Sequence, residues 1–504
     1  MALGRRDFLK RSAAGAALLT AGAGVFKNSA FAMNPVIFQE KSDVSFVGSS
    51  EEGTRRQMIV DVLEPWRETV AAGIQGKTVL LKVNLVYWMS MLDDPALPLT
   101  HVDAVRGCLD FLKSINPDIP VVIGDCSATP TRMGDVATMF KGAGYNELLE
   151  EYSNIALNDL STWSAVEKPF WTPELTNNAT WAVPVICSYT DPSFYVISLC
   201  RPKTHNNMVI TGVNKNILMG APLNSGTVDG TDVIPKQFMH GAQGYANGKN
   251  PDEIKILSYN LFQMANIIYT EGTPALSVLD AWEGMEGDGP VSGTSIMQYC
   301  AVASIDPLAV DRIAAKLMGF SDEPTEPMNK ATPSYTDMRY LLWIANAGFG
   351  NYDLSRINFI LGSLEQVETY VKTYELSPNY TGDPSYETEW TGGAPAIVLD
   401  KIVANKSRSL DPKPYLIPQL QKRNSSGTVS INFSLPVAFS IKMSIYNLQG
   451  AEIRKLGKDY LSPGRYSITW DGCDSRGSHV PSGKYLIKFN YGSGELVDNV
   501  FMVK

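Results

Sequence analysis

Two short apolar segments place the strongest constraint on the fold of this chain. Residues 79–86 form a nearly continuous apolar run, and residues 120–123 form a second run that ends in Gly124 and Asp125. Strands that are apolar on both faces are typical of parallel sheets covered by helices. Between the two runs, Thr100 has the character of a helix N-cap and Asp103 that of a capping-box acid. The order strand, helix, strand predicts a βαβ unit with a right-handed crossover.

Further segments extend this pattern as far as residue 375. Residue spacing predicts an amphipathic helix over Thr54–Ala71, and apolar runs predict buried strands over Phe194–Leu199 and Ala275–Leu279, the second ending at Asp280. Asp306 followed by Pro307 is typical of a helix start, so a helix is predicted from there through Met318. Residues 334–346 also have a helical pattern. We therefore predict an α/β domain over residues 33–375, with a mainly parallel sheet flanked by helices.

The pattern changes in the last part of the chain. Residues 376–424 are rich in Pro, Tyr, Gly, Ser and Asn, which predicts a linker or an irregular wrap. After Ser425, apolar and polar residues alternate in several short segments that are separated by glycine-containing turns. This alternation predicts a small all-β, Ig-like sandwich over residues 425–504.

The first 32 residues have the features of a twin-arginine signal peptide. Arg5 and Arg6 precede a mild apolar run from Ala13 to Phe26, and Ala30-Phe31-Ala32 offers a cleavage site. The run is too short and too rich in Ala and Gly to cross a bilayer, and no later stretch qualifies. The sequence thus predicts export by the twin-arginine translocase, a periplasmic or extracellular location with cell-surface attachment as an option, and no transmembrane segment in the mature chain.

Charge and cysteine content exclude several function classes. The formal charge is −9, and it becomes −13 without residues 1–32, so nucleic acid is not an expected partner. The six cysteines form no C-x-x-C pair, which argues against a ferredoxin-type iron–sulfur cluster and a zinc ribbon. The sequence also lacks a nucleophile elbow, a phosphate-binding P-loop, an H-E-x-x-H motif and a dinucleotide-binding glycine motif.

Two families resemble parts of the chain. The segments 81–85, Arg201–His205 with Gly212–Gly220, and Asp280–Pro290 with Ser304–Asp311 resemble the domain of unknown function 362 family over residues 36–370. Some relatives in that family carry ferredoxin-like modules, whose cysteine pattern this chain lacks. The motifs Ile445–Gly450, Trp470–Gly472 and Ser482–Tyr485 resemble the Ig-like domain of flagellar hook-capping proteins and the sorting domains of type IX secretion cargo. The second resemblance implies either a sorting role or a passive accessory domain.

Polar residues follow several of the predicted strands. Asn84, Asp125, the Lys203-Thr204-His205 segment and Asp280 each stand at a predicted strand end. Because ligands bind at the carboxyl ends of the strands in open parallel sheets, we expect these residues to share one rim. This convergence is the main sequence argument for a functional site.

Histidine and lysine provide the expected chemistry of this site. We predict His205 as the proton-transfer residue and Lys203 and Lys215 as the groups that stabilise negative charge. Lys82, Asn84, Asn214 and Asn216 are predicted ligand-binding residues, with backbone amides near Gly212 as an anion site. The alternative is that Asn214 and Asn216 hold loops and that Lys215 is solvated.

Acidic residues indicate a divalent metal as an optional cofactor, whose identity the sequence leaves open. Residues 283–290 have the composition of a flexible acidic loop, so Glu286 and Asp288, joined by Asp125, are candidate ligands. A solvated glycine-rich loop is the alternative. We interpret Asp306 as a helix cap, while Asp311 faces either the site or solvent. His101 and His240 are weaker candidates than His205, and His479 is expected to be exposed.

These observations lead to one expected function and one alternative. The expected function is an enzyme or cofactor site that binds a small anionic molecule. The alternative is a non-catalytic ligand-binding or cell-surface protein in which the sandwich serves for attachment or sorting.

Overall fold

A computed structural model describes most of the two predicted domains of the 504-residue chain. The described residues are 41–86, 96–126, 136–172, 179–226, 228, 233–240, 251–271, 275–323, 333–346, 349–378, 423–425, 428–435, 439–461, 464–491 and 494–502. The predicted signal at 1–32 and nearly all of the predicted linker at 376–424 lie outside the described residues. In the described part of the chain, no helix is long and apolar enough to cross a membrane.

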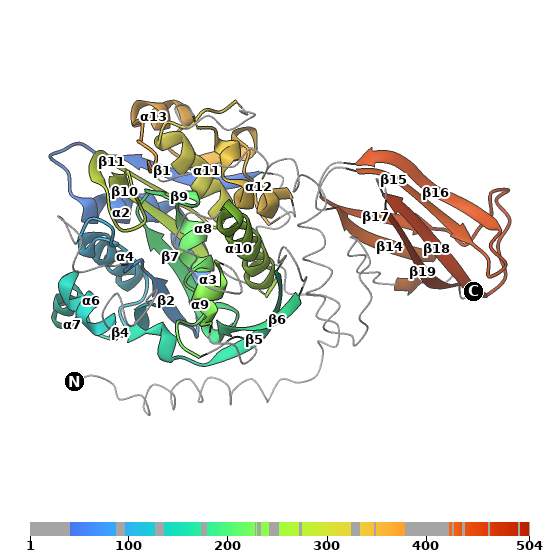
Figure 1. The fold of residues 1–504 in the computed structure, drawn as a ribbon, viewed down its shortest axis with the longest axis horizontal. Coiled ribbons are helices and arrows are strands. Elements are labelled where there is room, and N and C mark those ends of the chain that lie inside the picture. The colour runs from blue at the N-terminus through green and yellow to red at the C-terminus, as the bar shows by residue number, and fades with distance from the viewer. Residues whose placement is uncertain are drawn as a thin grey trace.

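The α/β domain is built on a ten-stranded sheet (Figure 1). Its main path has the order β12-β1-β11-β10-β7-β2-β3-β4, and β8 and β9 pair beside β10. The five strands from β10 to β4 run parallel, whereas β11 is antiparallel to both of its neighbours. The strands are β1 (Ser42–Gly48), β2 (Thr78–Lys82), β3 (Val121–Asp125), β4 (Ile155–Asp159), β7 (Phe194–Cys200), β8 (Lys203–His205), β9 (Val209–Thr211), β10 (Leu276–Glu286), β11 (Thr294–Ser304) and β12 (Ile357–Leu361).

Helices cover the sheet on both faces (Figure 1). Neighbouring residues of β2 show this, because Leu81 packs in the core with α2 and α4, whereas Leu80 packs in the core with α8 and α10. A hairpin of β5 (Ala165–Thr172) and β6 (Ala179–Ile186) stands apart from the main sheet. The helices are α2 (Arg55–Leu63), α3 (Arg67–Gly73), α4 (Val102–Ile115), α6 (Val136–Gly142), α7 (Leu148–Glu151), α8 (Val213–Leu218), α9 (Pro235–Phe238), α10 (Pro251–Glu271), α11 (Pro307–Leu317), α12 (Arg339–Asn346) and α13 (Leu364–Thr369). The predicted fold class is confirmed.

One predicted helix start and one predicted helix interior differ in detail. The helix predicted over Thr54–Ala71 is interrupted by a 3₁₀ turn at Glu64–Trp66, because Pro65 cannot donate a backbone hydrogen bond. The prediction that Thr100 caps α4 is wrong. His101 is the N-cap, and its Nδ1 accepts from the Asp103 amide at 3.1 Å. The Thr100 hydroxyl instead accepts a hydrogen bond from the Asn84 amide and donates one to the Leu199 carbonyl.

Strand β10 is longer than the sequence predicts. It does not end at Asp280 but continues to Glu286, because residues 276–286 pair with β11 over almost their whole length. Residues 283–286, predicted as part of a flexible loop, are therefore strand. Asp280 lies in the middle of β10 and is fully buried. Asp280 is therefore not at a strand end. Of the four segments that were predicted to share one rim of the sheet, the other three remain.

The predicted start of α11 is confirmed. The Asp306 carboxylate accepts from the amides of Leu308 at 2.9 Å and Ala309 at 3.3 Å. The helix predicted over 334–346 is a 3₁₀ turn at Tyr335–Asp337, capped by Ser334, followed by α12. These starts were predictable because each cap depends on residues within three positions.

The C-terminal domain contains two antiparallel sheets of three and four strands (Figure 1). Their orders are β13-β14-β17 and β16-β15-β18-β19. Trp470 is fully buried, and its indole nitrogen donates to the Cys473 carbonyl at 2.9 Å. His479 is exposed, as predicted. The strands are β13 (Arg423–Ser425), β14 (Thr428–Leu435), β15 (Phe439–Tyr446), β16 (Glu452–Leu461), β17 (Gly464–Trp470), β18 (Gly483–Tyr491) and β19 (Gly494–Met502).

Candidate functional site

A buried ion pair joins the carboxyl ends of β2 and β3. Lys82 Nζ lies 2.7 Å from Asp125 Oδ1, and the two side chains are only 2% and 4% exposed. Lys82 also donates to the Val83 carbonyl at 2.6 Å and to Asn216 Oδ1 at 2.8 Å. Asp125 accepts in addition from the Leu85 amide at 2.6 Å. Burial lowers the pKa of Lys82, and the Asp125 charge opposes that shift.

Asn214 and Asn216 belong to α8, and they hold this helix in place. Asn214 Nδ2 donates to Asp311 Oδ2 and to the Pro307 carbonyl, both at 2.8 Å. Asn216 Nδ2 donates to the Lys82 carbonyl and to Ser198 Oγ, both at 3.1 Å. The structure thus shows a positioning role for both residues, which corresponds to the alternative interpretation of the sequence.

The predicted anion site at the start of α8 is filled by the protein itself. Asp311 accepts from the amides of Val213 at 2.8 Å and Asn214 at 3.1 Å. Asp311 therefore faces neither a ligand site nor solvent. It is fully buried, and burial raises its pKa to about 6.

Replacing Asp311 with asparagine should loosen α8. The amide nitrogen of the new side chain would face backbone donors that now meet a carboxylate oxygen. We expect the free energy of unfolding to fall by about 2 kcal/mol, as for a lost buried hydrogen bond. Chemical denaturation measures this, with Asp353→Asn as the control because Asp353 caps only a short, exposed 3₁₀ turn. Equal effects of the two variants would contradict the prediction.

Lys203 lies beside the ion pair with its amine directed at carbonyl oxygens. Its Nζ donates to the Pro98 carbonyl at 2.7 Å and lies 3.4 Å from both Asn84 Oδ1 and the Pro290 carbonyl. The side chain is fully buried, and burial lowers its pKa to about 7. The amine therefore exchanges a proton within the physiological range. Asn84 acts on this lysine as an orienting group.

His205 is held as a neutral ring. Its Nδ1 accepts from the amides of Asn207 at 3.0 Å and Met208 at 3.2 Å, so the ring proton is assigned to Nε2. Burial, followed by the charge of Lys215, lowers the pKa of His205 well below its ordinary value. In the free protein this residue is a hydrogen-bond donor through Nε2 rather than a charged proton source.

Lys215 differs from its neighbours because nothing in the described structure binds its amine. The side chain is 6% exposed, yet no described residue accepts a hydrogen bond from Nζ or forms an ion pair with it. Burial, followed by repulsion from Lys203, lowers its pKa well below the ordinary value. The predicted alternative of a solvated Lys215 is wrong, because the side chain is buried.

Together these residues form a buried basic cluster. Its members are Lys82, Lys203, His205, Lys215, Lys236 and His240, all at most 9% exposed. Of its four lysines, only Lys82 forms an ion pair with a described carboxylate. Sequence reasoning missed Lys236, which donates to the Cys126 carbonyl. The sequence signal that could have found Lys236 is Pro235, because proline is typical of the first residue of a helix. It indicates that Lys236 lies on a short helix.

The three predicted metal ligands have separate partners. Asp125 contacts Lys82, Glu286 accepts from the Glu375 amide at 2.7 Å, and Asp288 accepts from Ser377 Oγ at 2.5 Å. Within the described ranges, no three His, Cys, Asp or Glu side chains are placed to hold a metal ion together. An ammonium group stands where a cation would meet Asp125, so these residues do not fit a shared metal site.

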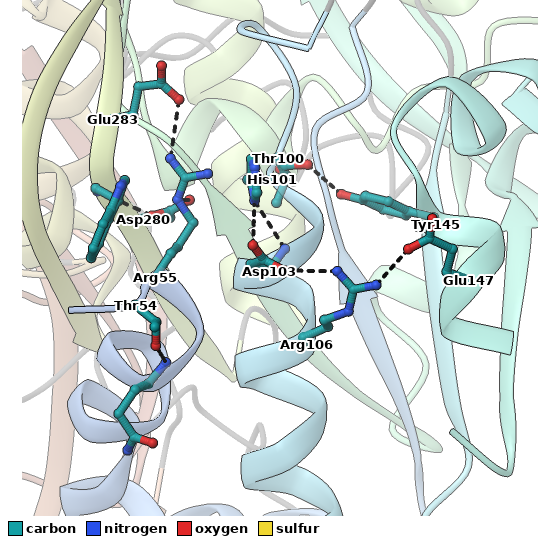
Figure 2. Close-up of polar contacts among 12 residues, drawn as sticks. Thr54, Arg55, Thr100, His101, Asp103, Arg106, Tyr145, Glu147, Asp280 and Glu283 are labelled. Carbon is teal, nitrogen blue, oxygen red and sulfur yellow. Dashed lines mark hydrogen bonds and ion pairs between the residues drawn. The ribbon is translucent and has the colours of Figure 1, made fainter. Parts of the chain in front are cut away.

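Asp280 belongs to a second charged group, in which Arg55 at the start of α2 meets Asp280 and Glu283 of β10 (Figure 2). Arg55 lies between Asp280, at 3.4 Å, and Glu283, at 3.2 Å. Arg201 lies 3.2 Å from the same Glu283 oxygen. Burial, followed by the Arg55 charge, lowers the pKa of His101 to about 4. The two arginines balance the two carboxylates, so we interpret this group as one that stabilises the fold. His101 acts there as the N-cap of α4.

Comparison with known families identifies both domains. Residues 79–316 match the family described as Domain of unknown function (DUF362). The α/β domain is a DUF362 domain. Residues 418–495 match the FlgD Ig-like domain. The resemblances to the domain of unknown function 362 family and to the Ig-like domain of hook-capping proteins are confirmed. Among curated proteins, no significant match to the chain is found.

Solved structures add only distant similarities to the DUF362 and Ig-like assignments. FlgD from P. aeruginosa shares 22% identity with a TM-score of 0.14, covering 16% of this chain and 65% of that one. FlgD from Xanthomonas campestris, described in connection with hook capping, shares 22% identity with a TM-score of 0.14, covering 17% and 64%. This chain thus spans slightly less than two thirds of either FlgD. A Thermotoga maritima protein shares 13% identity with a TM-score of 0.30, covering 60% and 67%.

Proposed function

We propose that the DUF362 domain binds a small anionic molecule at the buried basic cluster. The observation that carries this proposal is the Lys215 amine, which is buried without a described partner. A buried amine without a hydrogen-bond partner is unfavourable, and a bound carboxylate or phosphate would accept its hydrogen bond and complement the positive charges of the neighbouring lysines. Lys203 and the Nε2–H of His205 would be the further donors.

The remaining residues of the cluster support the donors. Asn84 orients Lys203, and Asn216 links Lys82 to the helix that carries Lys215. Asp125 neutralises Lys82, so this lysine belongs to the framework more than to the ligand shell. A metal is not included in the proposal because the candidate acidic residues have other partners.

Export is a separate part of the proposal. The Arg5-Arg6 motif supports transport through the twin-arginine translocase to the periplasm or beyond. That route carries folded proteins, so the domain would cross with its site already formed. The second candidate function, a non-catalytic surface protein, draws support from the FlgD Ig-like domain. Both candidates share the anion site and differ in whether the bound molecule is converted.

Anion binding should be coupled to proton uptake. The pKa of Lys203 is about 7 in the free protein, and a bound anion would raise it. We therefore expect affinity for lactate or sulfate to fall as the pH rises from 6 to about 8.5, with net proton uptake above pH 7. Calorimetric titration in buffers of different ionisation enthalpy measures the protons taken up.

The Lys203→Met variant provides the control for this coupling. It should bind about ten- to a hundredfold more weakly at pH 6 and lose most of the pH dependence, because a charge-assisted hydrogen bond is removed. Affinity that does not change between pH 6 and about 8.5 in the unmodified protein, with no proton uptake, would contradict the proposed site.

A further inference from the structure

We infer that Lys215 is a nucleophile that forms an imine with a small 2-oxo carboxylate. This inference rests on the proposed anion site and assigns it a substrate class and a covalent step. An imine requires an unprotonated amine, held rigidly and shielded from water, beside a group that binds the carboxylate.

The local structure holds Lys215 rigidly. It lies in the middle of α8, between two asparagines that are anchored on opposite sides. Asn214 is fixed by Asp311, Pro307 and the Tyr269 hydroxyl. Asn216 is fixed by the end of β2 and by Ser198 on β7. A side chain on such an anchored helix holds its reacting atom more precisely than one on a loop.

The four buried lysines of the cluster differ in what their amines contact. Lys82 has a carboxylate, Lys236 has the Cys126 carbonyl, and Lys203 has the Pro98 carbonyl. Lys215 has no such contact among the described residues, and Lys203 repels its positive charge. Desolvation beside a second cation is a recognised means of keeping a lysine neutral and nucleophilic. Lys215 is therefore the lysine whose lone pair is available.

The neighbouring groups fit a 2-oxo acid better than a simple anion. In such a compound the carbonyl carbon is bonded directly to the carboxylate carbon. His205 Nε2–H and the Lys203 ammonium, which interact electrostatically with Lys215, would bind the carboxylate and the carbonyl oxygen, and the carbonyl carbon would then be the point of attack for the Lys215 nitrogen. An inorganic anion would use the charge of the site but not this nucleophile.

The chemical step is balanced without an oxidant or reductant. The Lys215 nitrogen attacks the carbonyl carbon, a C–N bond forms, and the π electrons of the C=O bond move to oxygen. Lys203 gives that oxygen a proton and regains one from the new N–H group. Lys203 then gives a second proton to the hydroxyl group, which leaves as water, and the protonated imine remains; Lys203 regains its proton from solvent. The sum is one amine, one carbonyl compound and one proton giving one iminium ion and one water.

The test is reductive trapping on the full chain. The protein is incubated with pyruvate and sodium cyanoborohydride, and the adduct is located by intact mass and peptide mapping. Only about one exposed lysine amine in a thousand is neutral near pH 7.4, so the adduct at Lys215 should exceed that at any surface lysine by at least about tenfold. Lys215→Met should remove this adduct, whereas Lys113→Met should not, since Lys113 is a half-buried lysine outside the cluster.

Binding and adduct formation are measured separately, so a failure of the inference can be distinguished from a failure of the proposed function. Lactate has the carboxylate without the ketone, so it should bind without forming an adduct. Lactate and pyruvate binding without an adduct at Lys215 would overturn the imine and leave the anion site standing. Binding of neither would overturn both. An adduct spread equally over surface lysines would also overturn the inference, and peptide mapping of the unmodified protein shows this even if Lys215→Met folds poorly.

Discussion

Replacing Lys82 with methionine is expected to lower the free energy of unfolding of the α/β domain by about 3–5 kcal/mol. The substitution keeps most of the side-chain volume and removes the ammonium group. Asp125 would then remain buried at the end of β3 without its counter-charge. Asn216 would also lose the donor that now reaches its Oδ1. Chemical denaturation, followed by a signal from the α/β domain, measures the change.

A second substitution separates the charge effect from lost packing. In the double variant Lys82→Met with Asp125→Asn, no buried charge is left, and the side-chain oxygen of the new asparagine can still accept a backbone amide. We expect this double variant to recover at least about 1 kcal/mol relative to Lys82→Met alone, which is a coupling typical of contacting residues. If the double variant is no more stable than the single one, the ion pair is not the source of the destabilisation.

The sequence predicted the α/β fold well because that information is local. Continuous apolar runs at β2, β3 and β7 require burial on both faces, and the core clusters on the two faces of the sheet confirm this. The Asp306 cap needed only the following three residues. By contrast, the extension of β10 past Asp280 depends on pairing with β11 and on Arg55, which lies far away in the chain. The acidic and glycine residues 283–287 alone resemble a loop.

The candidate site was predictable in composition but not in its partners. Lys203 and His205 could be proposed from their position after a predicted strand, and Lys215 from its place between two asparagines near Gly212. The occupation of the α8 amides by Asp311 could not, because 98 residues separate Val213 from Asp311. The same holds for the contact of Lys82 with Asp125, a residue predicted as a metal ligand. Which lysine lacks a partner is a property of the assembled fold, and that property distinguishes Lys215.

Replacing Lys215 with methionine is expected to stabilise the protein while abolishing anion binding. The methionine side chain fills nearly the same volume and has no amine to desolvate. We expect the free energy of unfolding to rise by roughly 1–3 kcal/mol at pH 7, the range for an unsatisfied buried polar group. When the removal of a polar group makes a protein more stable, that group is typical of a functional site, whose residues serve activity and destabilise the fold.

The pH dependence of this gain tests its cause. The pKa of Lys215 is lowered in the folded protein, so between that value and the ordinary 10.5 the unfolded chain binds more protons. The stability of the unmodified protein should therefore rise with pH across this range, and the advantage of Lys215→Met should shrink as the pH increases. Lys236→Met is the matched control, because Lys236 is equally buried but donates to a carbonyl. That variant should lose stability where Lys215→Met gains it, and a loss in both would show that the Lys215 amine has a stabilising partner after all.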